Sequence, residues 1–230
     1  MDMCLGIEKK VITLAIHRMT FGSKEEWLKH RTKIGGSDAS CILGLNPWKN
    51  NIELWMEKTG QATPNDISDK ECVKYGVSAE PLLRELFALD FPEYEVEYFG
   101  DNMILNDDYP FAAASLDGEL TEKATGRKGI LEIKTTNILQ SMQKEKWKGK
   151  LPDNYYVQCI HYLLVTGYSF VILKAQLKSE FNGEVYLQVK HYKIERADVE
   201  EDIKYLEDAE KRFWQQVQNK TRPALLLPSI

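Results

Sequence analysis

Hydrophobic positions recur at helical spacing in the N-terminal part of the chain. The segment Ser23–Glu26 has the sequence of a capping box and predicts a helix that runs to about residue 33. Gly35 and Gly36 interrupt the pattern, after which Ser37 or Asp38 can cap a second helix. Helices are further expected over about 37–43, 51–58 and 78–89, the last with Pro81 in its first turn, and 61–70 is expected to be a loop.

From residue 94 onwards the period changes to that of β-strands. Tyr94, Val96 and Tyr98 alternate with glutamates, and residues 185–189 show the same alternation. The order of helices, a strand meander, a helix, two strands and a helix predicts an α/β or α+β sheet flanked by helices. Strands are expected over about 94–98, 102–105, 111–120, 129–135, 168–177 and 184–194, helices over about 154–166 and 197–217, and Asn137 is expected to cap the segment that contains the lysines of 144–150.

Composition narrows the class of protein. The 230 residues are 43% hydrophobic and 28% charged, which fits one compact domain and excludes a wholly disordered chain. The sequence indicates neither a membrane span nor a signal peptide, so a cytosolic protein is expected. Four cysteines without a C-x-x-C pair argue against a zinc ribbon or a local iron–sulfur cluster. The net charge of −5 argues against indiscriminate binding of polyanions but leaves room for a local basic groove.

The strongest candidate for chemistry lies between residues 111 and 136. Asp117 ends an apolar run, and Glu132 and Lys134 stand two positions apart in a predicted strand. Side chains at i and i+2 project to one face, so Glu132 and Lys134 point together, and Asp117 joins them if its strand pairs with theirs. Two carboxylates with carbonyl and water oxygens suit Mg²⁺, and the lysine can position or help deprotonate an attacking water. A solvated strand face is the alternative interpretation.

Two helices carry further candidates. Glu80 is either a carboxylate favoured by the positive end of its helix or an acidic group that reaches the same site. Gln158 lies one turn from both Tyr155 and Tyr162 on one helical face. That face either packs on the sheet or offers an amide that hydrogen-bonds a phosphate or a water.

An anion site is predicted near residues 31–37. Arg31 is followed by two glycines and a capping serine, which bring a guanidinium, a hydroxyl and backbone N–H groups around one point. Alternatively, Arg31 is a surface ion-pair partner of Glu26 or Glu53. The tryptophans Trp48, Trp55 and Trp147 either pack in the core or stack on bases, and the lysines of 144–150 form either a solvated face or a contact with DNA backbone.

These motifs resemble a known nuclease superfamily. Asp117, Glu132 and Lys134 match the PD-(D/E)xK pattern. The G-x-x-x-E-P arrangement at Glu80, the Q-x-x-x-Y arrangement at Gln158 and the segments 27–48 and 53–60 narrow the match. Over residues 20–175 the chain is similar to the YqaJ-like viral recombinase family, which is related to lambda exonuclease.

The resemblance implies a restriction-endonuclease-like core with a mixed central sheet. One nuclease domain over 1–230 is expected, with an N-terminal helical DNA-end-binding region (20–60), a core (71–195) and a C-terminal helix and tail (196–230). Asp117, Glu132 and the carbonyl of Ile133 are implied as ligands of two Mg²⁺ ions, for which Mn²⁺ can substitute. Glu80 is implied as direct or water-mediated support, and Lys134 and Gln158 as residues that position the water.

The implied activity is a 5′→3′ exonuclease that digests one strand of linear duplex DNA from a 5′-phosphorylated end and supplies 3′ single strands to phage-type recombination. Arg31 and Ser37 are implied to hold the 5′-phosphate, with the DNA in contact with Tyr155 and Tyr162. The spacing between Arg31 and Ser37 is one residue shorter than that between the corresponding residues of lambda exonuclease. Ser40 or the backbone of Gly36 and Ser37 are therefore alternative contacts for the phosphate. The rival classes are a structure-specific or restriction-type endonuclease and a non-catalytic DNA-binding protein.

The resemblance also implies an assembly and a biological setting. A homotrimeric ring around the DNA is expected, as is a single-strand annealing protein as partner, in the cytoplasm of a bacterium that carries a phage or prophage. The helix over 197–217 and the apolar tail 224–227 are the candidate subunit interface, with docking of the tail on its own chain as the alternative.

Overall fold

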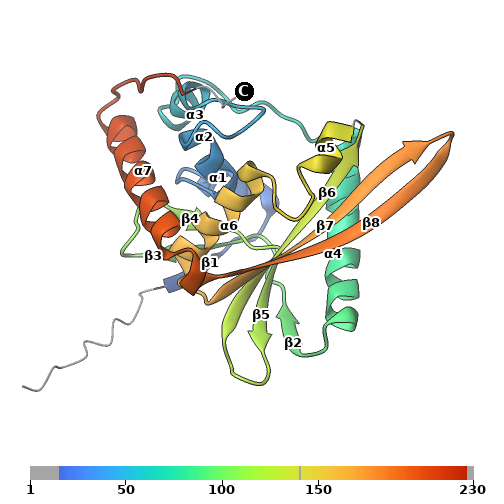
Figure 1. Cartoon of the computed structure of the whole chain (residues 1–230). Helices are drawn as coiled ribbons and strands as arrows, with labels where there is room; N and C mark the ends of the chain where they lie inside the picture. Colours follow the sequence, from blue (N-terminus) through green and yellow to red (C-terminus); the bar gives the residue numbers. More distant parts are fainter. Residues whose placement is uncertain (1–15, 140, 227–230) are drawn as a thin grey trace, which may run out of the picture.

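The computed structural model describes residues 16–139 and 141–226, which Figure 1 traces from blue to red. The helices are α1 (Lys24–His30), α2 (Gly36–Ile42), α3 (Asn51–Lys58), α4 (Glu71–Asp90), α5 (Ser141–Glu145), α6 (Asp153–Thr166) and α7 (Glu200–Gln218). The strands are β1 (Ile16–Thr20), β2 (Tyr94–Glu97), β3 (Asn102–Asn106), β4 (Ala113–Ala114), β5 (Gly118–Glu122), β6 (Lys128–Ile138), β7 (Phe170–Phe181) and β8 (Glu184–Glu195). A 3₁₀ turn, Arg196–Asp198, precedes α7.

Two sheets organise these elements. The larger has the strand order β2-β5-β6-β7-β8, with β6 and β7 parallel and the other neighbours antiparallel. Strands β1, β3 and β4 form a smaller antiparallel sheet. The predicted class, a mixed sheet flanked by helices, is confirmed.

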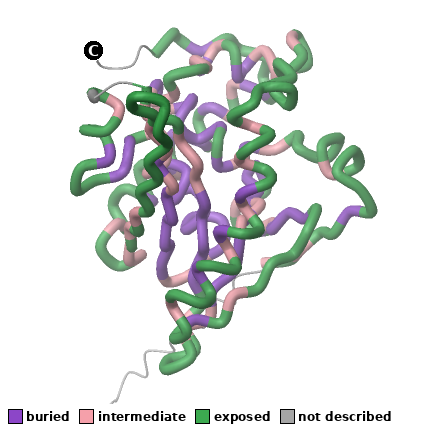
Figure 2. The backbone as a smooth tube through the Cα atoms, turned by 90° about the vertical axis from the view of Figure 1, so that its right-hand side faces the viewer, coloured by how far each residue is buried: buried purple, intermediate pink, exposed green. Residues whose placement is uncertain are grey.

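Helices cover both faces of the larger sheet. On one face, Ala79 and Leu83 of α4 are buried against Leu131 and Ile133 of β6. On the other face lies α6, which is buried along most of its length and in turn contacts α2 and α7. Figure 2 shows the buried strands at the centre, with exposed helical turns around them.

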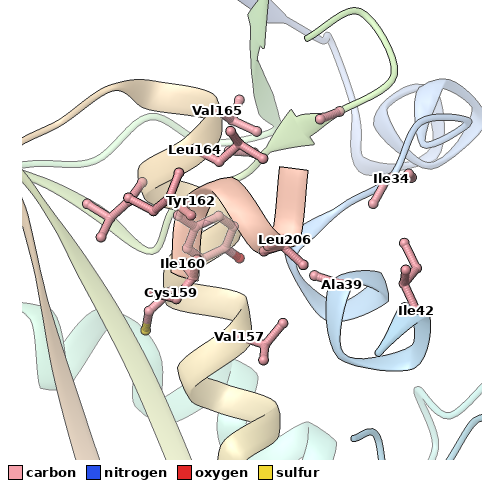
Figure 3. Packing of buried hydrophobic residues seen from close by; sticks show 14 of the residues in the cluster. Ile34, Ala39, Ile42, Val157, Cys159, Ile160, Tyr162, Leu164, Val165 and Leu206 are labelled. Carbon is pink, nitrogen blue, oxygen red and sulfur yellow. The ribbon is translucent and has the colours of Figure 1, made fainter. Parts of the chain in front are cut away.

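The packing of α6 fixes the relative positions of the N-terminal and C-terminal helices. Val157 and Tyr162 of α6 belong to one hydrophobic cluster with Ala39 of α2 and Leu206 of α7, and Figure 3 shows these side chains together. Segments far apart in the sequence therefore meet at this helix.

Helix α4 is longer than predicted. It begins at Glu71 rather than near Ser78, so Pro81 lies inside it and not in its first turn. Pro81 has no N–H for the carbonyl four residues earlier, which belongs to the exposed residue Val77, where water can donate instead. The packing of α4 on β6 outweighs this single lost hydrogen bond.

Three other boundaries also differ from prediction. The strand expected over 111–120 is divided, because β4 pairs with β3 in the small sheet whereas β5 pairs with β2 and β6 in the large one. Asn137 belongs to β6 and caps no helix, because β6 pairs with β7 as far as Ile138. Helix α1 ends at His30 rather than near residue 33.

Within the described ranges, no helix has the length and hydrophobicity needed to cross a membrane.

Candidate active site

The end of the β5–β6 ladder brings Asp117 to Glu132. The last pair of this ladder is Gly118 with Leu131, so Asp117, which directly precedes β5, lies beside Glu132. Oδ2 of Asp117 accepts a 2.8 Å hydrogen bond from the main-chain N–H of Ile133. This bond fixes the carboxylate at the open edge of β6.

Glu132 and Lys134 project to one face of β6, as the strand period predicts. Lys134 Nζ forms an ion pair with Oε1 of Glu132, and Nε2 of Gln158 donates to the same oxygen at 2.9 Å. Burial and the charge of Asp117 raise the pKa of Glu132 to about 8, although Lys134 opposes the shift. Burial alone would lower the pKa of Lys134, but Glu132 and Asp117 outweigh it and raise that pKa, so the amine is a cation.

The hydrogen bonding around Glu132 is incomplete in a way that fits a divalent cation. Its Oε2 is buried and has no hydrogen-bond partner within the described part of the chain, which is costly for a carboxylate. The N–H of Ile133 points to Asp117, and its C=O points to the same strand edge because both groups of a strand residue face one side.

These donors match a partial magnesium site. Among the described residues, no group of three His, Cys, Asp or Glu side chains is placed to hold a metal on its own. Mg²⁺ commonly takes one or two protein carboxylates and completes its shell with water and phosphate oxygens. Asp117, Glu132 and the Ile133 carbonyl therefore fit the implied cation.

Glu80 reaches the edge of this group from α4. It lines one cleft together with Asp117, and burial and the Asp117 charge raise the pKa of Glu80 while Arg84 opposes the shift. Because α4 begins at Glu71, Glu80 lies in mid-helix, and the interpretation of it as a charge at the helix N-terminus is wrong.

Arg84 is a site residue that the sequence analysis missed. Its Nη2 donates to Oε1 of Glu80 and its Nε donates to the main-chain oxygen of Asp117, both at 2.6 Å. The guanidinium carbon lies 3.5 Å from the centroid of the Tyr98 ring. The available signal was the spacing of four residues from Glu80, which places both side chains on one helical face.

Arg31 lies at the C-terminal end of α1, with its guanidinium carbon 4.7 Å from the centroid of the Trp27 ring. The alternative partners are engaged locally: Glu26 accepts from the N–H of Gly22, and Glu53 accepts from the N–H of Asn50. No ion pair of Arg31 occurs within the described ranges, so its interpretation as a partner of Glu26 or Glu53 is wrong.

The start of α2 differs from the predicted anion site in one respect. The N-cap is Gly35 rather than Ser37 or Asp38, and its N–H donates to Oδ2 of Asp38 at 3.1 Å. Burial would raise the pKa of Asp38, but its ion pair with Lys58 (2.7 Å) outweighs burial and lowers that pKa. The Gly35 N–H therefore donates its hydrogen bond to a carboxylate of the same chain instead of to an external anion.

Gly36 joins the predicted anion site to the carboxylates. A Cβ at this position would lie 2.6 Å from Cε1 of Tyr162 and 3.0 Å from Cγ of Gln158. Only glycine allows the backbone of α2 to approach α6 this closely. The hydroxyl of Tyr162 also accepts a hydrogen bond of 2.8 Å from Nε2 of Gln158.

Two clefts meet at the carboxylates. The larger, of about 500 Å³, is lined among others by Arg31, Gly36, Ser37, Glu80, Arg84, Asp117, Gln158 and Tyr162. The smaller, of about 260 Å³, is lined by Cys72, Val73, Gly76, Glu80, Asp117, Ile133, Lys134 and Thr135. Glu80 and Asp117 line both clefts and so lie at their junction, whereas Glu132 is buried and lines neither.

Some candidates lie outside these clefts. Ser40 is buried and its hydroxyl accepts from Asn46, so the structure does not place it at the anion site. Tyr155 lines neither cleft, and its ring centroid lies 5.4 Å from Lys134 Nζ. Trp55 and Trp147 are core residues, whereas Trp48 is 73% exposed.

Comparison with known families adds an independent observation. The family model of the YqaJ-like viral recombinase domain matches residues 26–169, which is more than half of the chain. The chain belongs to the YqaJ-like viral recombinase family. This YqaJ-like chain is 36% identical over 196 residues to the uncharacterized protein YqaJ of Bacillus subtilis (strain 168). The match covers 84% of the chain and only 56% of that relative, so the chain spans little more than half the relative's length.

Solved structures share the fold of the YqaJ-like chain. The alkaline exonuclease LHK-Exo of Laribacter hongkongensis is similar with a TM-score of 0.61 at 18% identity, over 85% of this chain and 93% of that one. A phage-related exonuclease of Haemophilus somnus 129PT is similar with a TM-score of 0.50 at 13% identity, over 82% of this chain and 96% of that one. At these identities the likeness establishes the fold alone.

Proposed function

We propose that this chain is a Mg²⁺-dependent exonuclease that degrades one strand of linear double-stranded DNA in the 5′→3′ direction from a 5′-phosphorylated end. One observation carries the proposal: a single cleft is lined by Arg31, Gly36 and Ser37 together with Asp117 and Gln158. A terminal nucleotide with its 5′-phosphate on Arg31 would direct its next phosphodiester towards the carboxylates. The fold shared with two exonucleases supports this assignment.

The acidic side chains near the end of the β5–β6 ladder would hold the cation. Asp117, Glu132 and the Ile133 carbonyl would provide the ligands, with Glu80 close by. When bound there, Mg²⁺ would polarise the scissile phosphate and lower the pKa of the attacking water. The unpartnered Oε2 of Glu132 supports this arrangement.

Lys134 and Gln158 would act on the reacting groups. Lys134 is cationic beside Glu132, so it would orient the water and stabilise negative charge on the phosphate rather than accept a proton. Gln158 bonds both Glu132 and Tyr162 and would keep the carboxylate in a single orientation. Water attacks phosphorus, the bond to the 3′-oxygen of the terminal nucleotide breaks, and that oxygen takes up a proton.

The chemistry regenerates its own recognition element. Cleavage at that bond releases a 5′-mononucleotide and leaves a 5′-phosphate on the next residue of the strand. Arg31, with Ser37 or the Gly36 backbone, would bind this new phosphate in each cycle. A crystal structure of LHK-Exo in complex with dAMP, with a TM-score of 0.59 to this chain, supports a mononucleotide-sized site in the fold.

The biological role follows from the family rather than from the cleft. Digestion of one strand leaves 3′ single strands, which a strand-annealing protein could take up during phage-type recombination. The family name, viral recombinase, supports this setting.

One experiment tests the proposal against its rivals. Purified protein is incubated with Mg²⁺ or with EDTA on three substrates: linear duplex with 5′-phosphate, linear duplex with 5′-hydroxyl, and covalently closed circles. We expect Mg²⁺-dependent release of mononucleotides, fastest from the phosphorylated end, with circles intact. A strand labelled at its 3′ end should keep its label until late in the digestion.

Other results would assign another class. Cleavage of the closed circle would indicate an endonuclease with the same core. DNA binding without any cleavage in Mg²⁺ or Mn²⁺ would indicate a non-catalytic DNA-binding protein.

A further inference from the structure

Arg84 is a mostly buried arginine that contacts three separate parts of the chain and has no part in the chemistry described above. Its side chain is 12% exposed. It bonds Glu80 on its own helix, bonds the main chain of Asp117 between β4 and β5, and stacks on Tyr98 beyond the end of β2. No other side chain of the described residues bonds both Glu80 and Asp117.

Hydrogen bonds constrain both carboxylate residues. Arg84 donates hydrogen bonds to Oε1 of Glu80 and to the carbonyl oxygen of Asp117, and the N–H of Ile133 donates one to Oδ2 of Asp117. Asp117 is therefore held at its main chain and at its side chain. The planar guanidinium donates from two nitrogens in fixed directions, which a lysine ammonium cannot reproduce.

The charge of Arg84 has a separate consequence. The positive charge of Arg84 offsets the repulsion between Glu80 and Asp117 when no cation is bound. The stacked Tyr98 ring restricts the guanidinium further, because a cation over an aromatic face is attracted to it.

We propose that Arg84 is a positioning residue that sets the separation of Glu80 and Asp117 for a divalent cation. This inference rests on the proposed metal-dependent nuclease function. Direct binding of a DNA phosphate is the competing role, because Arg84 also lines the larger cleft. Two of its nitrogens are already engaged by protein oxygens, which favours the positioning role.

The direct test measures cation binding without DNA. Mn²⁺ is titrated into the full-length wild-type protein, Arg84→Lys and Arg84→Ala by calorimetry, with Mn²⁺-dependent thermal shifts as a second readout. Loss of a residue that orients metal ligands typically costs 10- to 100-fold in metal affinity. We expect a loss of about 10-fold or more in both variants, because Arg84→Lys retains the charge but not the two-nitrogen geometry. Wild-type affinity in Arg84→Lys would overturn the inference.

Kinetics separates positioning from contact with substrate. We expect the Mg²⁺ concentration for half-maximal cleavage to rise by the same factor of about 10 or more, with the KM for DNA unchanged. Weaker DNA binding with unchanged cation affinity would instead show that Arg84 contacts a phosphate, and would also overturn the inference.

Two matched controls exclude a general loss of structure. Arg18 makes the same pair of contacts elsewhere, an ion pair with the buried Glu119 and stacking 3.5 Å from the centroid of the Phe99 ring. Arg18→Ala should lower thermal stability without changing Mn²⁺ affinity. At the ring, Tyr98→Leu should weaken Mn²⁺ binding and Tyr98→Phe should not. Equal loss of Mn²⁺ affinity in Arg18→Ala would refute a specific role for Arg84.

Failure of the inference is distinguishable from failure of the proposed function. A wild-type protein that neither binds Mn²⁺ nor cleaves DNA contradicts the proposed function itself. A wild-type protein that does both, alongside Arg84 variants that bind Mn²⁺ equally well, contradicts only the role of Arg84.

Discussion

At the scale of single residues, Lys134 should separate catalysis from binding. Its ammonium pairs with the buried Glu132 and lines the smaller cleft, where it can reach water but does not replace the cation ligands. We expect Lys134→Ala to lower the rate of cleavage by about 10²- to 10⁴-fold while folding and DNA affinity stay near wild type. Single-turnover cleavage and DNA binding by fluorescence anisotropy provide the two measurements. Lys204→Ala, at an exposed position on α7, is the control, and near-wild-type cleavage by Lys134→Ala would refute the assignment.

Glu132 should show the opposite relation between stability and activity. Burial and Asp117 raise its pKa to about 8, so the ionised carboxylate is unfavourable in the folded protein without a cation. We expect Glu132→Gln to abolish cleavage and to leave the thermal unfolding temperature in EDTA unchanged or higher. Mg²⁺ should then stabilise wild type and not the variant. A clear loss of stability in EDTA would show that Glu132 is instead a structural partner of Lys134.

Arg31 should determine the preference for a phosphorylated end. A charge-assisted hydrogen bond contributes on the order of 1.5–3 kcal/mol, or about 10- to 150-fold. Arg31→Ala should therefore slow digestion from 5′-phosphate by that factor and leave 5′-hydroxyl ends nearly unchanged. Arg212→Ala, exposed on α7, serves as the matched loss of one positive charge. Full retention of the phosphate preference would place the anion contact elsewhere.

At the scale of elements, strands with uninterrupted alternation and helices with local caps could be predicted from sequence. The Glu132–Lys134 pair follows from the two-residue period alone, and the closing of α6 by Gly167 in a left-handed conformation (φ 66°) follows from its glycine. The division of 111–120 into β4 and β5 could not be predicted, because it arises from pairing with two different sheets.

The candidate site was predictable where one element carries several of its residues. Glu132 and Lys134 share β6, and Gln158 and Tyr162 share α6. Lys58 forms an ion pair with Asp38, and Arg84 donates a hydrogen bond to the main-chain carbonyl of Asp117. Both interactions join segments that are distant in the sequence, so no local pattern predicts them. The approach of Gly36 to Tyr162, which joins the two halves of the cleft, is of the same kind.

A buried ion pair connects α6 to α7 and predicts a pH dependence of stability. His161 Nδ1 lies 2.7 Å from Oε1 of Glu210 and its Nε2 lies 3.0 Å from the carbonyl oxygen of Ala113, so both nitrogens can donate only when the ring is protonated. Burial would lower the pKa of His161, but Glu210 outweighs it, with smaller contributions from the Ala113 carbonyl and Asp38, and raises that pKa.

The raised pKa of His161 determines whether the stability of the protein rises or falls with pH. Between the unfolded pKa of about 6.5 and the higher folded value, the folded protein binds more protons, so its stability falls as pH rises through that window. Urea unfolding at several pH values from 6 upwards should show this decline in wild type and a smaller one in the double variant His161→Gln/Glu210→Gln. Equal slopes in the two proteins would show that His161 does not carry the dependence.

At the scale of the whole molecule, the structure shows which parts of the two expected interface segments, α7 and the tail, already contact their own chain. The apolar side of α7, with Ile203, Leu206 and Phe213, is buried within its own chain. The tail also docks on its own chain as far as Leu226, whose N–H donates to Asn51 Oδ1 at 3.0 Å, and Leu227 lies outside the described residues. The parts of α7 and of the tail that can still contact another subunit are their exposed side chains, such as Tyr205 and Leu225.

Two further exposed apolar surfaces are candidates for a contact between subunits. Leu82, Leu86 and Leu89 form a stripe on α4, at positions that share one helical face. Val185 and Leu187 are exposed on β8, an edge strand of the larger sheet. Two different apolar surfaces on one chain are what a head-to-tail contact requires, and such contacts close into rings.

From the resemblance to lambda exonuclease we expect a homotrimeric ring, in which the exposed lysines 144, 146, 148 and 150 together with Arg31 face enclosed DNA and the net charge of −5 is concentrated outside. Light scattering should give a mass about three times 26.6 kDa. Leu82→Gln/Leu89→Gln and Val185→Gln/Leu187→Gln should each shift the protein towards monomer and shorten the tract digested per binding event, because an open subunit releases DNA between cleavages. Cleavage of the first nucleotide should change little, since these side chains line neither cleft. A monomer at micromolar concentration that still digests thousands of nucleotides per encounter would exclude the ring as the source of processivity.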